Sequence, residues 1–167
     1  MVTAMSLLSL ILWAWLGVSL WMTGLWIIQL FTRNAAIVDV GWTVSLPVLH
    51  LYFALQGGGD PWRSGVLASL VGLWGFRLGG YLFWTRARPG VPEEGRYLRL
   101  RQQWGSRFQW NLFCFYQAQA AAALFLSSLF LPIYQCASPW SGTWELMGLA
   151  LFLLGFAGVT LADSQLH

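Results

Sequence analysis

The sequence has little charge, and none of its basic residues is a lysine. Only 9% of the 167 residues are charged, the nine basic residues are all arginine, and 57% of the residues are hydrophobic. A soluble domain averages about 25% charged residues. This composition excludes a water-soluble domain and predicts an integral membrane protein built from α-helices.

Cysteine and histidine are scarce as well. We expect Cys114 and Cys136 near opposite ends of one helix, where about 22 residues rise roughly 33 Å. A disulfide needs Cα atoms within about 7 Å, so two free thiols are predicted. His50 is the one histidine inside an apolar run, because His167 is terminal. A metal site needs more ligands than this, and none is expected.

The start of the chain does not read as a cleavable signal peptide. Residues 1–5 contain no basic residue, and the apolar run that follows extends to Phe31. The apolar region of a signal peptide is only about 7 to 15 residues long. We therefore interpret the run as a retained membrane helix.

Five stretches are long and apolar enough to cross a membrane, which takes about 20 residues each. They cover residues 5–31, 35–56, 64–85, 108–131 and 142–162. Segment 86–107 is polar and is expected to be a loop between the third and fourth helices. The predicted fold is a single all-α membrane domain, residues 1–167, with five transmembrane helices.

Arginine is distributed unevenly between the two ends of these helices. Six of the nine arginines fall in segment 86–107, and Arg33 lies on the same side, whereas only Arg63 lies on the other. Cytoplasmic segments of membrane proteins carry the excess of basic residues. The N-terminus is therefore predicted outside and the C-terminus in the cytoplasm, in a multi-pass protein of the cell membrane, taken as a bacterial inner membrane.

This orientation rule explains most of the charge of segment 86–107. The remaining interpretations are binding of anionic lipid headgroups and binding of the phosphates of a nucleotide cofactor, which arginine contacts in a bidentate manner. Membrane lipids are thus expected partners, and nucleic acid is not.

Two charged residues lie inside the predicted membrane helices, Asp39 in the second and Arg77 in the third. A charge at such depth costs roughly 2.5 to 3.5 kcal/mol on insertion scales, so it usually has a partner. We expect Asp39 and Arg77 to pair or to flank one polar pocket near the cytoplasmic side. The alternative is an ion pair that only locks two helices together.

Aromatic and polar residues near Arg77 predict a cavity for a small molecule. Trp74 and Tyr81 share a helical face with Arg77. Gln117, with Asn111 and Tyr116, reaches a similar depth from the fourth helix. Small-molecule sites combine apolar walls with a few polar groups. The alternative is an aromatic packing face with polar side chains that reach toward the membrane surface.

Small residues recur at a spacing of four on two predicted helices. Gly75 and Gly79 form one such pair, and Ala118 and Ala122 form another. Spacing of this kind lets helix backbones approach closely in membranes. We interpret both pairs as packing surfaces.

Short motifs along the chain resemble one known family. They are RN at 33–34, VDVGW at 38–42, LWGFRL at 73–78, RY at 96–97, LP at 131–132 and ADSQL at 162–166. Together they are similar to the DUF1295 family, which is grouped with the C-terminal domains of steroid 5-alpha-reductases and, more loosely, with isoprenylcysteine carboxyl methyltransferases.

The resemblance implies a polytopic reductase-like fold that binds NADPH from the cytoplasmic side. Such a protein reduces an activated carbon–carbon double bond in a lipid-soluble, steroid-like or isoprenoid-like substrate. On this basis Asp39 is the catalytic carboxylate that helps to hold the substrate carbonyl, and Trp74, Tyr81 and Gln117 are substrate-binding. The implied cofactor contacts are Arg77, Arg86 and Arg88.

The sequence also departs from the family pattern in two respects. The tyrosine that donates a proton in the steroid enzymes falls at Trp74, and indole is not a general acid. In the family, further helices follow the Asp-x-Gln-Leu segment. The expectation is therefore the N-terminal portion of a reductase-like protein, inactive alone and completed by a separate C-terminal segment. The alternatives are a non-catalytic scaffold or lipid-binding protein, and a methyltransferase-like fragment.

Overall fold

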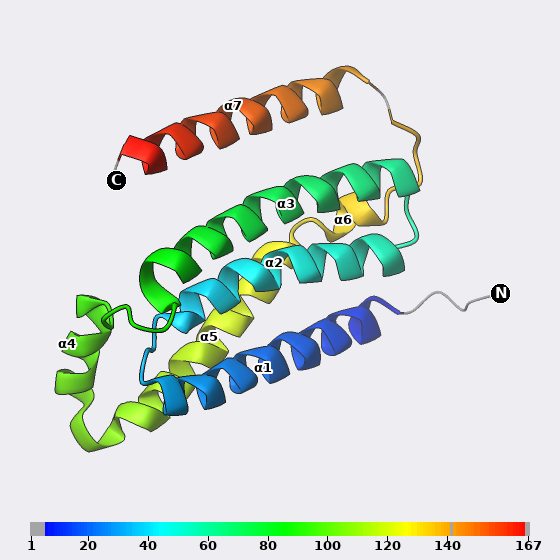
Figure 1. The fold of residues 1–167 in the computed structure, drawn as a ribbon. Helices are drawn as coiled ribbons and strands as arrows, with labels where there is room; N and C mark the ends of the chain where they lie inside the picture. The colour runs from blue at the N-terminus through cyan, green and yellow to red at the C-terminus, as the bar shows by residue number, and fades with distance from the viewer. Residues whose placement is uncertain (1–5, 141, 166–167) are drawn as a thin grey trace.

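The computed structural model describes residues 6–140 and 142–165 as an array of helices (Figure 1). No strand occurs among these residues, so the predicted all-α class is confirmed. Three residues named above lie outside the described residues: Met5 of the first expected helix, Leu166 of the last motif, and the terminal His167.

Each of the five long helices overlaps one of the apolar stretches. Successive long helices run in opposite directions, so their ends gather at two sides of the molecule (Figure 1). The long helices are α1 Leu7–Thr32, α2 Ile37–Gln56, α3 Pro61–Leu82, α5 Phe108–Ser128 and α7 Thr143–Gln165. The short elements are the π-helical turn η1 Phe83–Ala87, α4 Gly95–Trp104, the 3₁₀ turn η2 Gly105–Arg107 and α6 Leu131–Tyr134.

Four of the described helices are long and apolar enough to cross a membrane. They are α1, α2, the continuous helix 61–87 formed by α3 and η1, and α7. The chain is therefore a membrane protein. A fifth span was predicted from the sequence at 108–131. Helix α5 in that region does not meet the same measure, because Gln109, Asn111, Gln117 and Gln119 dilute its apolar residues.

The core lies among α1, α2 and α5. Its largest fully buried side chains include Met22 from α1, Phe53 from α2 and Tyr116 from α5. Tyr134 of α6 is also fully buried, and its hydroxyl lies 2.8 Å from Nδ1 of His50. The lone histidine of the apolar run is thus part of a buried polar pair that joins α6 to α2.

Close packing of α2 against α3 confirms the interpretation of the first small-residue pair. A Cβ placed on Gly75 would lie 2.8 Å from the backbone oxygen of Thr43, and one on Gly79 would lie 2.9 Å from the Thr43 Oγ1. The interpretation of the second pair was wrong. Ala118 and Ala122 are exposed, and the buried small residues of α5 include Ala120 and Ala123 instead.

Segment 86–107 is more ordered than the loop that the sequence analysis expected, because it contains α4. Tyr97, Leu100 and Trp104 recur at the spacing of a helical face. Tyr97 is fully buried, and the other two pack partly against the core. Gly105 ends the helix with a positive φ of 49°, a conformation that glycine adopts readily. An amphipathic helix therefore covers one end of the bundle.

Helix α7 stands apart from the rest of the bundle and runs parallel to α3 (Figure 1). None of its described residues is buried. Two ion pairs connect it to α3, Arg63 with Glu145 at 3.0 Å and Arg77 with Asp163 at 2.6 Å. Helix α7 is therefore attached at its two ends and leaves open space beneath its middle.

Candidate functional site

Asp39 lies in the first turn of α2, where the chain has just turned out of α1. The Asn34 side chain fixes this turn: its Oδ1 accepts a hydrogen bond from the Ala36 N–H at 3.0 Å, and its Nδ2 donates to the Arg86 carbonyl oxygen at 2.8 Å. A carboxylate in the first turn also benefits from the partial positive charge of the helix N-terminus. One asparagine thus links the start of α2 to the end of the third membrane helix.

Two further contacts hold the same turn from the other side. The Ala35 N–H donates to Oε1 of Glu93 at 2.9 Å, and the buried Tyr116 hydroxyl donates to the Ala35 carbonyl oxygen at 3.0 Å. Arg101 of α4 donates to both carboxylate oxygens of Glu93. The start of α2, helix α4 and helix α5 therefore form one connected framework around Asp39.

The Asp39 carboxylate is the centre of a polar cluster. Nη2 of Arg96 donates to its Oδ2 at 2.6 Å, and the Tyr97 hydroxyl donates to its Oδ1 at 3.0 Å. Nη1 of Arg86 lies 3.8 Å from the same Oδ2 and donates to Glu94 at 3.0 Å. The carboxylate therefore has a phenol on one oxygen and two guanidinium groups on the other.

Tyr97 keeps its proton in this environment. Its side chain is fully buried. Burial, followed by the nearby Asp39 carboxylate, raises the pKa of the Tyr97 phenol above its ordinary value. The guanidinium of Arg96 also lies over the Tyr97 ring, 4.7 Å from its centre. At neutral pH the cluster thus contains a protonated phenol that points at an aspartate.

A cavity of about 310 Å³ opens beside Asp39. Its polar lining comes from α2, η1, α4 and α5, and its apolar lining comes from α3. The lining residues are Asp39, Trp42, Thr43, Leu78, Leu82, Arg86, Arg96 and Gln119. The indole N–H of Trp42 is buried without a hydrogen-bond partner in the described part of the chain. The cavity therefore offers hydrogen-bond donors to a polar group, with one carboxylate among them.

The π-helical turn η1 sets the direction of two arginines. The Arg88 N–H donates to the Phe83 carbonyl oxygen at 2.8 Å, five residues back, so the turn holds one residue more than an α-helical turn. The Arg86 side chain then reaches Asp39 and Glu94. The Arg88 guanidinium lies over the Trp84 ring, 4.5 Å from its centre. Turns of this kind often occur at functional sites.

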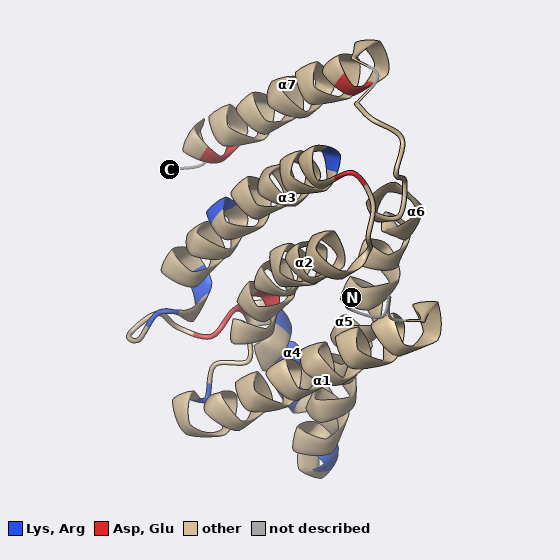
Figure 2. Cartoon of the chain, turned by 90° about the vertical axis from the view of Figure 1, so that its right-hand side faces the viewer, with Lys and Arg blue, Asp and Glu red and all other residues tan. Residues whose placement is uncertain are grey.

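The end of the bundle around Asp39 is positively charged. Most of the charged positions lie at helix ends (Figure 2). The arginines at this end are Arg33, Arg86, Arg88, Arg96, Arg99, Arg101 and Arg107, and the carboxylates are Asp39, Glu93 and Glu94. Within residues 6–140 and 142–165, Arg33, Arg88, Arg99 and Arg107 form no ion pair with a carboxylate. We call all seven arginines at this end of the bundle, paired or not, the arginine surface.

The expected pair of Asp39 with Arg77 was wrong. Arg77 pairs with Asp163 of α7 instead, and its guanidinium also faces the Phe156 ring at 5.8 Å. The helical period explains the difference, since Gly75 and Gly79 turn toward α2 and a residue midway between them turns away. The structure therefore places Arg77 apart from Arg86 and Arg88.

The three predicted substrate residues do not meet in one cavity. Trp74 lines the space between α3 and α7. Gln117 donates to the Thr23 Oγ1 of α1 at 3.1 Å. Tyr81 is half-buried near the end of α3. Equal depth in the membrane was the reason for grouping them, but depth does not determine which neighbouring helix a side chain faces.

The partners of Asp39 were not predicted from the sequence. Arg96 and Tyr97 were recognised only as part of a motif, and Glu94 and Gln119 were not recognised. Asp39 is separated from Arg96 by 57 positions in the sequence, so no local spacing links them. The available signal was the helical spacing of Tyr97, Leu100 and Trp104, which predicts that α4 packs on the bundle. The prediction of two free cysteines is confirmed for Cys114 and Cys136, but the expected single helix was wrong, because α5 ends at Ser128 and Cys136 follows α6.

Comparison with known proteins gives a family and no individual relative. No curated protein and no solved structure matches the chain. Residues 25–167 match the family described as "Protein of unknown function (DUF1295)". This range contains the Asp39 cluster, the arginine surface and all of α2 to α7. The chain belongs to the DUF1295 family.

Proposed function

We propose that this protein is a membrane-embedded reductase that uses NADPH to reduce a lipid-soluble substrate at the Asp39 cluster. One observation carries the proposal: a carboxylate and two guanidinium groups line a small cavity at the ends of apolar helices, and a buried, protonated phenol donates to that carboxylate. A lipophilic molecule can place its body among such helices and its polar end at such a cavity. The resemblance to steroid 5-alpha-reductases supports the redox role.

The arginine surface fits the phosphates of a dinucleotide. When bound, NADPH supplies a hydride to the double bond. Arg88 and Arg99 have no carboxylate partner among the described residues, and both are exposed. Arginine binds phosphate oxygens in a bidentate manner. Arg77 does not fit this role as well, because Asp163 already holds its guanidinium.

Reduction of a double bond adds a hydride to one carbon and a proton to its neighbour. In the proposed role, Arg86 and Arg96 line the cavity and hydrogen-bond a substrate oxygen, which offsets the negative charge that develops there. The proton starts on the Tyr97 hydroxyl, which donates to the Asp39 carboxylate; Asp39 relays it to the substrate carbon, and water then returns a proton to Tyr97. Trp74 has no part in this step, since it faces α7.

Binding of NADPH to the purified protein tests the proposal. The protein is placed in nanodiscs of neutral lipid, and the fluorescence of NADPH is followed as protein is added. We expect saturable binding that Arg88→Gln weakens and Arg77→Gln leaves unchanged. If Arg77→Gln is the more damaging variant, the cofactor is not on the arginine surface.

The second candidate function is binding of anionic lipid without catalysis. Two exposed tryptophans at the arginine end favour it, Trp84 at 64% exposure and Trp110 at 67%. Tryptophan is typical of the boundary between a membrane and water, and arginines beside it attract anionic headgroups. Lipid binding should fall steeply with salt and be indifferent to Asp39→Asn, whereas substrate turnover should depend on Asp39.

A further inference from the structure

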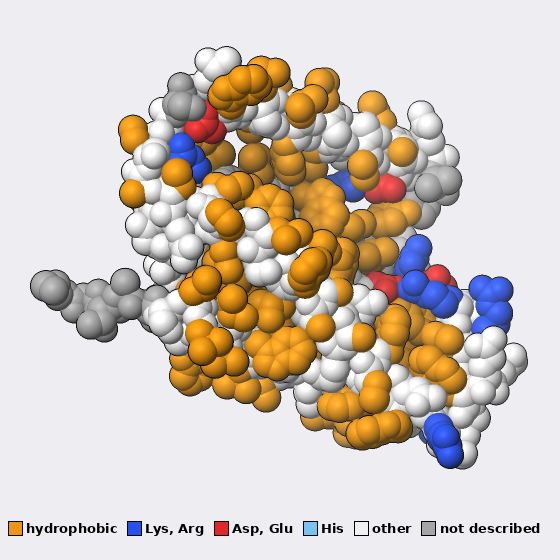
Figure 3. Space-filling model, turned by 180° about the vertical axis from the view of Figure 1, so that it is seen from behind, with side chains coloured by type: hydrophobic (Ala, Val, Ile, Leu, Met, Phe, Trp, Pro, Cys, Tyr) orange, Lys and Arg blue, Asp and Glu red, His pale blue; other side chains and the backbone are white. Residues whose placement is uncertain are grey.

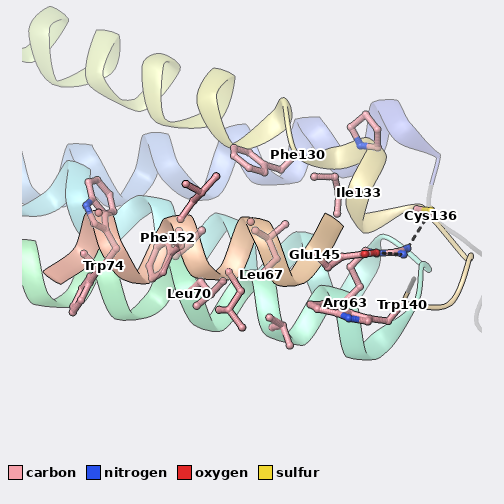
Figure 4. Close-up of a pocket in the computed structure, with 18 of the residues that line it drawn as sticks. Arg63, Leu67, Leu70, Trp74, Phe130, Ile133, Cys136, Trp140, Glu145 and Phe152 are labelled. Carbon is pink, nitrogen blue, oxygen red and sulfur yellow. Dashed lines mark hydrogen bonds and ion pairs between the residues drawn. The ribbon is translucent and has the colours of Figure 1, made fainter. Parts of the chain in front are cut away.

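A large apolar cavity lies between α3 and α7. Its volume is about 930 Å³. Leu70 and Trp74 from α3, Phe152 from α7 and Phe130 beside α6 direct their side chains into it (Figure 4). From behind, hydrophobic side chains line the recess beneath α7 (Figure 3). This cavity shares no lining residue with the cavity at Asp39.

The size of the cavity fits a small molecule. Small-molecule sites measure about 300 to 1,000 Å³. At about 930 Å³ the cavity lies near the upper end of this range, which suits a long molecule.

The position of the cavity determines the polarity of its ligand. Both walls, α3 and α7, are helices that can cross a membrane. The ion pairs that join them lie toward the two ends, and the lining between is almost wholly apolar. The middle of the cavity therefore lies at the depth of the hydrocarbon, and a ligand enters from the lipid. Such a ligand has a long apolar body.

The two ends of the cavity differ in what they offer to a polar group. At one end the Arg63 guanidinium already donates to four acceptors, the Cys136 Sγ, the Ser138 and Pro139 carbonyl oxygens and the Glu145 Oε1. Beyond the other end lies Arg77, whose guanidinium faces the ring of the lining residue Phe156 and, within residues 6–140 and 142–165, donates only to Asp163. Arg77 thus has N–H groups left to donate. The adjacent Asp163 carboxylate disfavours an anionic group, so a neutral acceptor fits best.

We infer that the cavity between α3 and α7 binds a neutral long-chain lipophile with one hydrogen-bond-accepting end, which lies toward Arg77. Long-chain alcohols and isoprenoid alcohols belong to this class. The inference goes beyond the proposed reductase function, because it rests on a different cavity and needs no cofactor.

Photolabelling with a diazirine derivative of hexadecanol tests this inference. The protein is irradiated in nanodiscs of neutral phospholipid, and labelled peptides are located by mass spectrometry. We expect label on the facing sides of α3 and α7, and we expect unlabelled hexadecanol to compete with it. Label spread evenly over lipid-facing residues of α1 as well, without competition, would mean ordinary surrounding lipid and would overturn the inference.

Two glycines of α7 supply a matched pair of variants. A Cβ on Gly155 or on Gly158 meets no atom within 4 Å, so a larger side chain is tolerated at either position. Gly155 lines the cavity and Gly158 does not. Gly155→Trp should therefore abolish the competed labelling, and Gly158→Trp should retain it. Equal labelling of the two variants contradicts the site. NADPH binding should be unchanged in both, which separates a failure here from a failure of the reductase proposal.

Cys136 gives an independent measurement, because it lines the same cavity. In a Cys114→Ser background, hexadecanol should slow alkylation of Cys136 by a membrane-permeant maleimide. It should do so less effectively in Arg77→Gln, because the alcohol then lacks its hydrogen-bond donor. No protection at any hexadecanol concentration, or a crosslink from Cys136 to a second polypeptide, shows that the cavity has another occupant and rejects the inference.

Discussion

The contact between α2 and α3 positions the Asp39 cavity, and substitutions of glycine along α3 test it. A Cβ on Gly75 would lie 2.7 Å from Cδ of Pro47 and 2.8 Å from the backbone oxygen of Thr43. Neither a proline ring nor a backbone carbonyl can turn aside. A Cβ on Gly79 would lie 2.9 Å from the Thr43 hydroxyl, whereas one on Gly80 would meet nothing within 4 Å.

These distances set the sign of each Gly→Ala substitution. Alanine is better than glycine in a helix by about 1 kcal/mol, so Gly80→Ala should stabilise the protein by up to that amount. Overpacking costs about 1 to 3 kcal/mol, so Gly75→Ala should be destabilising on balance, by up to about 2 kcal/mol. The change in unfolding free energy caused by Gly79→Ala should lie between the changes caused by the other two substitutions. Because Thr43 also lines the Asp39 cavity, Gly75→Ala should distort that cavity as well.

Reversible unfolding in mixed detergent micelles measures these differences. SDS is added stepwise to the protein in a mild detergent, and helix content is followed by circular dichroism. The predicted order of unfolding free energies is Gly80→Ala, then Gly79→Ala, then Gly75→Ala. If Gly75→Ala is as stable as Gly80→Ala, the two helices are not packed as closely as described.

Three further predictions concern individual side chains. Burial raises the pKa of Tyr97 in the folded protein. The contribution of its neutral phenol to the free energy of unfolding is therefore complete below the unfolded pKa of about 10 and is lost as the pH rises above it. In unfolding titrations, wild type should lose stability relative to Tyr97→Phe as the pH rises past 10. Hydrogen bonds from Ser138 and the charge of Arg63 lower the pKa of Cys136, so in Cys114→Ser the pH profile of iodoacetamide alkylation should have its midpoint below that of an unfolded control, and coincident midpoints would contradict this. Asn34→Ala removes the two side-chain hydrogen bonds that join the turn before α2 to Arg86 and should cost about 1 to 2 kcal/mol in the same SDS titration, with Asn111→Ala as a comparison.

The elements that could be predicted from the sequence are those that depend on composition and local spacing. The apolar runs determine the helices, and the glycines at 75 and 79 determine the close contact of α2 with α3. The missed elements depend on distant contacts. The partner of Asp39 lies on α4, whose position follows from the burial of Tyr97 and from the turn at Asn34. Neither is visible in a window of the sequence.

Arg77 shows a second limit of sequence reasoning. Its depth was predicted, but its direction depends on which face of α3 meets α2. The glycines at 75 and 79 contain this information, because a residue midway between them must point away. Choosing Asp163 over Asp39 also requires knowing that α7 runs beside α3, and this follows from the whole chain.

The most direct test of the proposed function is calorimetric titration of NADPH into the protein in neutral-lipid nanodiscs. We expect saturable binding by wild type, unchanged affinity in Asp39→Asn, and marked weakening in the double variant Arg88→Gln/Arg99→Gln. No saturable heat with wild type, or equal affinity in the double variant, would contradict a cofactor site on the arginine surface.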